Sequence, residues 1–299
     1  MSTSPEAGVP QSPFKSILNF RDVGSCINAL TNTSLLKPSL LFRSARPDEA
    51  SPEDVQKLTS TYGIHTIIDL RSNTEHIKQD EKFSQRRNAA TLTTTEQKAA
   101  NTVRMPGIKY ADIDLNGGAF TKALLWKLKW RSLAKLLALM AAGYRTEAIR
   151  VLGTEVMAPR GLIGLGKDSL DHSKVNIRQV FGLLAITSNY PIMVHCTQGK
   201  DRTGLIVILV LLLLDASMPA IRADYVASEK ELEPEKVERL KEIADVGLGE
   251  EFAGCPVGFV EEMQSYIDEK YGGIKPYLKA CGVETQQQES VVHNLARMK

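Results

Sequence analysis

The sequence predicts an α/β protein whose central, mostly parallel sheet carries helices on both faces. Two apolar runs of strand length, at 64–70 and 191–194, each follow a segment with the signals of a helix. The second run leads through a short loop into 205–214, which is apolar throughout and rich in leucine. Because a chain that alternates helices with buried strands builds a parallel sheet, these units predict the fold class.

Length and composition bound the domain organisation. The 299 residues are 43% hydrophobic, which is enough for one large domain, and we place it at 14–284. The Ser/Pro-rich segment 1–13 predicts a flexible tail, and 285–299 is expected to form a C-terminal tail. The net charge of +2 predicts no general affinity for nucleic acid, so no nucleic-acid partner is expected.

Cysteine usage and hydropathy predict the compartment. The four cysteines lie far apart without a CxxC pair, as in a protein of a reducing interior. The first residues lack the basic start and the apolar segment of a signal peptide, and 205–214 is too short to cross a membrane. We therefore expect a cytoplasmic protein, and leave open a peripheral contact with membranes.

The first elements follow in chain order. The short apolar run at 40–46 predicts a strand, and Arg43 within it is expected to form a structural ion pair with Asp22. Ser51 followed by proline predicts the start of a helix, which ends near Gly63.

Asp69 closes the strand predicted at 64–70. Open α/β sheets bind their ligands at the carboxyl ends of strands, so Asp69 is a site candidate. An ion pair with Arg71 that only holds the turn is an equal alternative.

The next stretch, 79–115, begins as a polar segment and ends as one in which apolar and polar residues alternate. The polar composition of 79–105 predicts an exposed connection, and the alternation in 108–115 predicts an edge strand. Asp112 and Asp114 belong to this strand, where carboxylates commonly face solvent.

A basic and aromatic segment at about 119–150 predicts a helical insertion. It holds one acid, Glu147, both tryptophans and many leucines, and its basic residues are Lys122, Lys127, Lys129, Arg131, Lys135, Arg145 and Arg150. One interpretation is a lid or a membrane-facing helix that attracts anionic lipid headgroups. The other is a helix that packs on the domain and exposes a solvated basic face.

Two segments connect the insertion to the central loop. The glycine-rich stretch 151–167 predicts a loop, and its spacing does not fit a nucleotide-binding motif. Ser173 predicts the cap of a helix at 173–188, which leads into the strand before Cys196.

The loop after the second strand has the composition of an anion site. Cys196 and Arg202 are separated by five residues, and a loop of that length at a helix N-terminus can turn its backbone amides toward one point. Gly199 relieves the steric cost of the curl, and the arginine fork can hold two phosphate oxygens. The predicted phosphate-binding residues are Thr197, Gln198, Gly199, Lys200, Asp201 and Arg202.

The same surroundings suit Cys196 to nucleophilic chemistry. Converging amides, the helix N-terminus and the cations Arg202 and Lys200 stabilise a thiolate, which is the reactive form of cysteine. Taken singly, a buried cysteine or a nearby arginine is usually structural. Their joint occurrence with strand, loop and helix favours phosphoryl chemistry.

This loop, HCTQGKDRTG at 195–204, resembles the signature HC-x5-R-[ST]-G of the cysteine-dependent protein tyrosine phosphatases. Its GKDRTG version is similar to an atypical branch of tyrosine/serine and phosphoinositide phosphatases of bacteria and fungi. Further matches are an NxRDxG element at 19–24, FRS at 42–44, DLRSxxE at 69–75 and DYxxS at 224–228. The resemblance implies a protein tyrosine phosphatase-like fold and phosphate-monoester hydrolysis without a metal or cofactor.

The resemblance also implies roles for single residues. Cys196 is expected to be the nucleophile, Arg202 the clamp for the phosphoryl oxygens, and Asp201 the general acid, while Asp69, Asp112 and Asp114 are competing acids. His195 is expected to orient the cysteine, and the Thr203 hydroxyl to donate to the thiolate. Lys200 is expected at the rim, where it would bind a second phosphate.

Several functions stay open at this stage. The expected substrate is a phosphotyrosine protein, with or without phosphoserine/threonine activity, or a phosphoinositide. A catalytically silent phosphate-binding module is the alternative, against which the intact pair of Cys196 and Arg202 argues. A cysteine protease using His172 or His293 is disfavoured, because nothing in the sequence orients such a pair.

Overall fold

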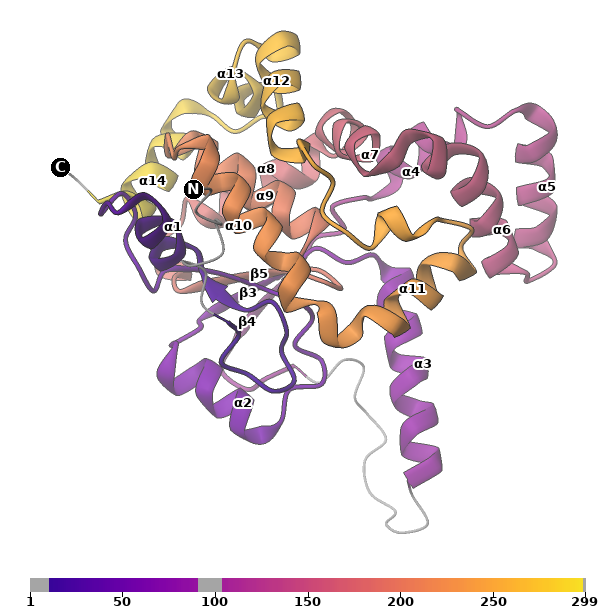
Figure 1. Cartoon of the computed structure of the whole chain (residues 1–299), viewed down its shortest axis with the longest axis horizontal. Coiled ribbons are helices and arrows are strands. Elements are labelled where there is room, and N and C mark those ends of the chain that lie inside the picture. Colours follow the sequence, from indigo (N-terminus) through magenta and orange to yellow (C-terminus); the bar gives the residue numbers. More distant parts are fainter. Residues whose placement is uncertain (1–10, 91–103, 298–299) are drawn as a thin grey trace, which may run out of the picture.

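Five strands form one sheet, and their order and directions confirm the predicted fold class. The computed structural model describes residues 11–90 and 104–297, without the side chains of 82–90 (Figure 1). Across the sheet the order is β1 (Arg21–Asp22), β2 (Leu41–Ser44), β5 (Ile192–His195), β3 (Thr66–Asp69) and β4 (Lys109–Asp112). β1 runs antiparallel to β2, and the other neighbouring strands are parallel.

The register aligns the carboxyl ends of the parallel strands. His195 lies between Ser44 of β2 and Asp69 of β3, and Asp69 lies beside Asp112 of β4. Each of these residues is the last of its strand. The chain therefore leaves four neighbouring strands on the same side of the sheet, at their carboxyl ends. β4 is one of the two outer strands of the sheet, so the predicted edge strand is confirmed.

Helices cover both faces of the sheet, as the sequence predicts (Figure 1). They are α1 (Val23–Thr31), α2 (Pro52–Gln56), α3 (Asn73–Ala90), α4 (Gly118–Leu125), α5 (Trp130–Ala141), α6 (Arg145–Leu152), α7 (Ala158–His172), α8 (Lys174–Leu184), α9 (Asp201–Leu213), α10 (Met218–Glu231), α11 (Lys236–Asp245), α12 (Phe259–Tyr271), α13 (Ile274–Ala280) and α14 (Thr285–Leu295). Two π-helical turns at Lys57–Thr61 and Gly153–Met157 extend α2 and join α6 to α7. Short 3-10 turns are Thr187–Asn189, Glu233–Glu235 and Glu250–Phe252.

Alternate strand residues face two separate cores, because side chains of a strand alternate between faces. Ile68 and Val194 belong to the larger core, which includes the apolar residues of α9, whereas Ile67 and Met193 belong to a smaller core on the other face. Ten residues of α9 are buried, so it is the packed helix that the sequence predicts and not a membrane span. Among the described residues, no helix is both long and apolar enough to span a bilayer.

The insertion forms three helices with a small core of their own. Side chains of α4, α5 and α6, among them Phe120, Leu124 and Leu136, pack against Leu165 of α7 and Phe252. In Figure 1 this group stands at one end of the molecule, with α5 outermost. The inner side of the insertion is therefore packed core, which was one of the two interpretations of its sequence.

The predictions for three segments need correction. The loop predicted at 151–167 is a π-helical turn followed by α7, and the connection predicted at 79–105 is helical as far as Ala90. The tail predicted at 285–299 is wrong, because α14 buries Val291 and Leu295 in the larger core. The predicted tail at 1–13 and the rest of the connection fall mainly on residues 1–10 and 91–103, which lie outside the described residues.

Candidate active site

The predicted loop lies in a cleft at the carboxyl edge of the sheet. Cys196 follows β5 directly, and α9 begins at Asp201, so the loop enters the N-terminus of a buried helix. Cys196 is only 3% exposed and lines a cleft of about 650 Å³ together with Thr197, Gln198, Asp201 and Arg202. A substrate phosphate must therefore enter the cleft to reach the thiol.

Polar side chains hold the loop backbone from behind. Asn19 Nδ2 donates to the carbonyl oxygens of Gln198 and Gly199 at 3.0 and 3.1 Å, and Arg43 Nη2 donates to that of Gly199 at 2.7 Å. The C=O and N–H groups of a trans peptide point in opposite directions. Because these carbonyls point toward Asn19 and Arg43, the amides of Gly199 and Lys200 point the other way, as an anion-binding nest requires.

Gly199 has the conformation that the sequence argument assigns to it. Its φ is +64°, and a Cβ there would lie 2.1 Å from the carbonyl oxygen of Ser44. Any other residue would combine left-handed backbone strain with a clash against β2. The prediction that glycine allows the loop to curl is confirmed.

Arg202 is oriented by a carboxylate from α3. Its Nη1 and Nη2 donate to Oε2 and Oε1 of Glu75, each at 2.6 Å, and Nη1 also donates to the carbonyl oxygen of Leu70 at 3.3 Å. Nε–H and one Nη2–H have no partner within the described chain, and these two donors lie on one edge of the guanidinium. That edge is free to bind two oxygens of a phosphate.

Glu75 also binds the loop itself, since the hydroxyl of Thr197 donates to its Oε1. Burial alone would raise the pKa of Glu75, but the charge of Arg202 and the hydrogen bonds from Arg202 and Thr197 outweigh it. The pKa of Glu75 is therefore held well below its usual range, and the carboxylate stays ionised. The sequence placed Glu75 only in a motif match, and its role as the partner of Arg202 was missed.

A buried carboxylate of α10 also supports the loop. Asp224 accepts from Arg21 Nε at 2.7 Å and from Arg43 Nη1 at 2.5 Å, and all three side chains are buried. Arg43 was predicted to pair with Asp22, and this is wrong, because Asp22 instead accepts from backbone amides at the start of α1. Asp224 thus fixes the arginine that holds Gly199.

Lys200 does not lie at the rim, which contradicts the sequence prediction. It is fully buried, and its Nζ donates to the carbonyl oxygens of Phe252, Ala253 and Gly254 at 3.1, 3.2 and 2.5 Å. Three carbonyls satisfy the three N–H groups of an ammonium, which makes this burial tolerable. In this position the lysine fastens the loop to 252–254 and cannot hold a second phosphate.

Asp69 and His195 form a structural pair beside the loop. Asp69 accepts from Arg71 at 2.7–3.1 Å, and His195 Nε2 lies 3.5 Å from its Oδ2. Burial would raise the pKa of Asp69, but the charges of His195 and Arg71 and the hydrogen bonds from Arg71 lower it to about 2. Asp69 is therefore a poor proton donor, and the alternative of a turn-holding ion pair is confirmed for it.

His195 is buried in the same pair and does not line the cleft. Burial lowers the pKa of His195, and its Nδ1 lies 3.2 Å from the carbonyl oxygen of Cys196. These contacts suit a residue that positions the start of the loop, and they agree with the predicted orienting role.

The structure separates the remaining acid candidates. Asp112 is exposed, pairs with Arg104 and lies outside the cleft that Cys196 lines. Asp114 and Asp201 both line that cleft, and one carboxylate oxygen of each is buried without a hydrogen-bond partner in the described chain, although that of Asp201 lies 3.5 Å from the Lys200 ammonium. Burial raises the pKa of Asp114, and Glu75 adds to the increase while Arg202 opposes it.

Thr203 makes no hydrogen bond to Cys196 in this structure. Its Oγ1 is buried and has no partner among the described residues. The expected donation to the thiolate is therefore not observed, although the hydroxyl is buried one residue from Arg202.

The cleft extends from the polar loop along apolar walls. Beyond Cys196 and Arg202 it is lined by side chains of the insertion, α7 and the segment around α11, which include Leu124, Ile149, Leu152, Leu162, Ile243, Val246 and Leu248. The insertion helices therefore form part of the binding cleft itself.

Fold and site together define a phosphatase of the protein-tyrosine type. The model of the family described as "Tyrosine phosphatase family" matches residues 12–297, so the chain belongs to that family. It is 30% identical over 159 residues to the tyrosine-protein phosphatase of Nostoc commune, a match that covers 47% of this chain and only 54% of that protein. It is 26% identical over 292 residues to the triple specificity protein phosphatase PtpB of Mycobacterium tuberculosis, covering 89% of this chain and 91% of that protein.

Proposed function

We propose that this chain hydrolyses phosphate monoesters through a phosphocysteine formed on Cys196. One arrangement carries the proposal: the thiol lies in a loop with inward amides, beside an arginine whose second edge is free. Amides and guanidinium would hold the three non-bridging oxygens of a phosphoryl group and stabilise the charge that they carry during transfer.

The reaction then has two steps. The thiolate of Cys196 attacks phosphorus, the S–P bond forms, and the P–O bond to the leaving group breaks as an acid protonates that oxygen. Water next attacks phosphorus while the same carboxylate takes its proton, the S–P bond breaks, and inorganic phosphate leaves. Asp201 is the first candidate for this acid, and Asp114 is the second because of its raised pKa.

The depth of the cleft favours a phosphotyrosyl protein as substrate. Since Cys196 is 3% exposed, a phosphate on a long aromatic side chain reaches it more easily than one on a short serine. The apolar walls suit the aromatic ring.

A phosphoinositide is the second candidate, and one observation favours it. The cleft has a volume of about 650 Å³ and is lined by many apolar side chains between Leu124 and Leu248, which would suit the glycerol and acyl part of a lipid. The relative from Mycobacterium tuberculosis is named a triple specificity protein phosphatase, and this likeness also supports a broad substrate range.

The test is phosphate release from a panel of phosphotyrosine, phosphoserine and phosphothreonine peptides and phosphoinositides, with Cys196→Ser as the control. We expect release from phosphotyrosine peptides and phosphoinositides, and none with the variant. Binding of phosphate without turnover of any ester would instead support the silent binding module.

A further inference from the structure

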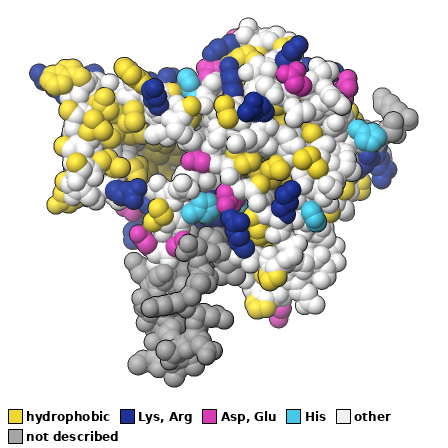
Figure 2. All heavy atoms as spheres, turned by 180° about the vertical axis from the view of Figure 1, so that it is seen from behind, with side chains coloured by type: hydrophobic (Ala, Val, Ile, Leu, Met, Phe, Trp, Pro, Cys, Tyr) yellow, Lys and Arg dark blue, Asp and Glu magenta, His cyan; other side chains and the backbone are white. Residues whose placement is uncertain are grey.

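The outward face of α5 is apolar and uncovered. Trp130 is 74% exposed and Leu137 is 57% exposed, and Ala134 and Ala141 lie on the same face of the helix. Trp126, in the turn before α5, is 78% exposed. We call these five positions together the α5 face, and Figure 2 shows apolar side chains gathered at this end of the molecule.

The opposite side of α5 is already used for packing. Leu136 is buried in the core of the insertion, and Leu133 and Leu139 pack against that core. A helix that is apolar on both sides is normally buried on both sides. The largely exposed Trp130 on such a helix, and the largely exposed Trp126 in the turn before it, therefore indicate a binding surface.

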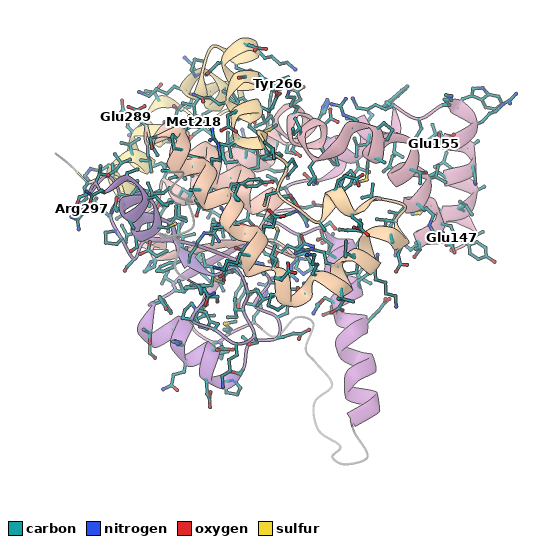
Figure 3. The ribbon with its side chains drawn as sticks, in the orientation of Figure 1. Glu147, Glu155, Met218, Tyr266, Glu289 and Arg297 are labelled. Atoms are coloured by element: carbon teal, nitrogen blue, oxygen red, sulfur yellow. The ribbon has the colours of Figure 1, made fainter. Side chains whose placement is uncertain are left out.

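Positive charge surrounds the α5 face. Lys129, Arg131 and Lys135 border it, and Lys122 and Arg145 lie on the neighbouring helices. Within residues 11–81 and 104–297, none of these five residues forms an ion pair with a carboxylate. Lys127, by contrast, pairs with Asp168. Glu147 is the one acid at 120–150, and Figure 3 shows it at the same end of the molecule.

We propose that the α5 face docks on the surface of an anionic lipid bilayer. Tryptophan favours the boundary between lipid tails and headgroups, and lysine and arginine at the border of the face can reach anionic headgroups. A protein partner is a poorer fit, because lysine is depleted at protein interfaces and the lysines at the border of this face form no ion pair within the described residues.

The position of the α5 face relates it to the cleft. Phe120 and Leu124 of α4 and Ile149 and Leu152 of α6 line the cleft, and α4 and α6 flank α5 in the chain. Docking through α5 would therefore act on the group of helices that forms one wall of the cleft. The binding step itself does not depend on the proposed phosphatase activity.

The chain offers a direct probe, because Trp126 and Trp130 are its only tryptophans. Their emission is recorded with the full chain while vesicles of phosphatidylcholine, with or without phosphatidylserine, are added. We expect a blue shift and co-sedimentation with the anionic vesicles, little of either with phosphatidylcholine alone, and a decrease as salt is added. The same blue shift on concentrating the protein without vesicles would show self-association and overturn the proposal.

Variants on exposed positions test the same surface by co-sedimentation. Trp126→Ala with Trp130→Ala should weaken vesicle binding roughly tenfold or more, and Arg131→Gln with Lys135→Gln by about fivefold per charge. The matched controls are Val237→Ala with Val257→Ala and Lys275→Gln with Lys279→Gln, which are exposed positions outside the insertion.

Turnover of a soluble aryl phosphate separates this proposal from the proposed function. The four double variants should keep the wild-type rate, which also shows that they fold. Unchanged vesicle binding by the tryptophan variant would overturn the docking proposal and leave the phosphatase proposal intact. An inactive wild type that binds vesicles normally would overturn the phosphatase proposal and leave the docking proposal intact.

Discussion

Replacing Glu75 by glutamine tests whether its carboxylate orients Arg202. The substitution keeps the shape of the side chain but removes the charge that accepts two hydrogen bonds of 2.6 Å from the guanidinium. The arginine then loses its fixed orientation, and misplacing a catalytic group by about 1 Å can cost on the order of 10²-fold in rate. We expect kcat toward an aryl phosphate to fall about 10- to 100-fold with a smaller change in KM.

The same variant should change the dependence of stability on pH. The pKa of Glu75 is lowered in the folded protein, so its contribution to stability is fully present above about pH 4.3, the unfolded value, and is lost as pH falls toward the folded value. The side chain is 30% exposed, so we expect a loss of only about 1–2 kcal/mol at neutral pH. In urea unfolding, wild type and variant should converge on acidification.

Glu81→Gln is the matched control, because Glu81 lies on the same helix and is exposed. It should leave both kcat and the pH dependence unchanged. Wild-type kcat in Glu75→Gln would refute the reasoning, since Arg202 would then keep its orientation without the carboxylate.

Three further predictions concern the acid, the loop and its support. If Asp201 is the general acid, Asp201→Asn should slow alkyl phosphates about 10²–10⁴-fold but barely affect an aryl phosphate with a good leaving group. If Asp114 is the general acid, Asp114→Asn should instead be the variant that slows alkyl phosphates selectively. The same variant should then lose the fall in rate at alkaline pH. Gly199→Ala should lower the free energy of unfolding by about 1–3 kcal/mol or more. Gly63→Ala is the control, because Gly63 also has a positive φ but a Cβ at that position would meet nothing within 4 Å. Asp224→Asn should cost about 3–5 kcal/mol in the same urea assay, because two buried arginines lose their charged partner; a loss below 1 kcal/mol would contradict this.

Local patterns were enough to predict the centre of the molecule. The strand before Cys196, the loop and the apolar helix after it are contiguous, and their lengths and residue types identify each of them. The need for glycine at 199 could be inferred for the same reason, since the curl of the loop is a local property.

Partners far apart in the sequence could not be predicted. Arg43 pairs with Asp224, 181 residues away, and not with the nearer Asp22, because the fold brings α10 behind the loop. The orientation of the Lys200 side chain could not be predicted from the sequence either, since its acceptors are backbone carbonyl oxygens, which any residue supplies. Asp69 and Asp114 both lie near the ends of predicted strands, and only their neighbours in space distinguish an ion-paired carboxylate from one with a raised pKa.

Phe252 belongs to two parts of the molecule at once. Its ring packs in the core of the insertion, and its carbonyl oxygen accepts from the buried ammonium of Lys200. A displacement of Phe252 together with the insertion would therefore move one of the three carbonyl oxygens that hold the Lys200 ammonium. The outermost helices of this protein and the loop that holds Cys196 thus share one residue, so we expect a change in the packing of the insertion to be felt at that loop.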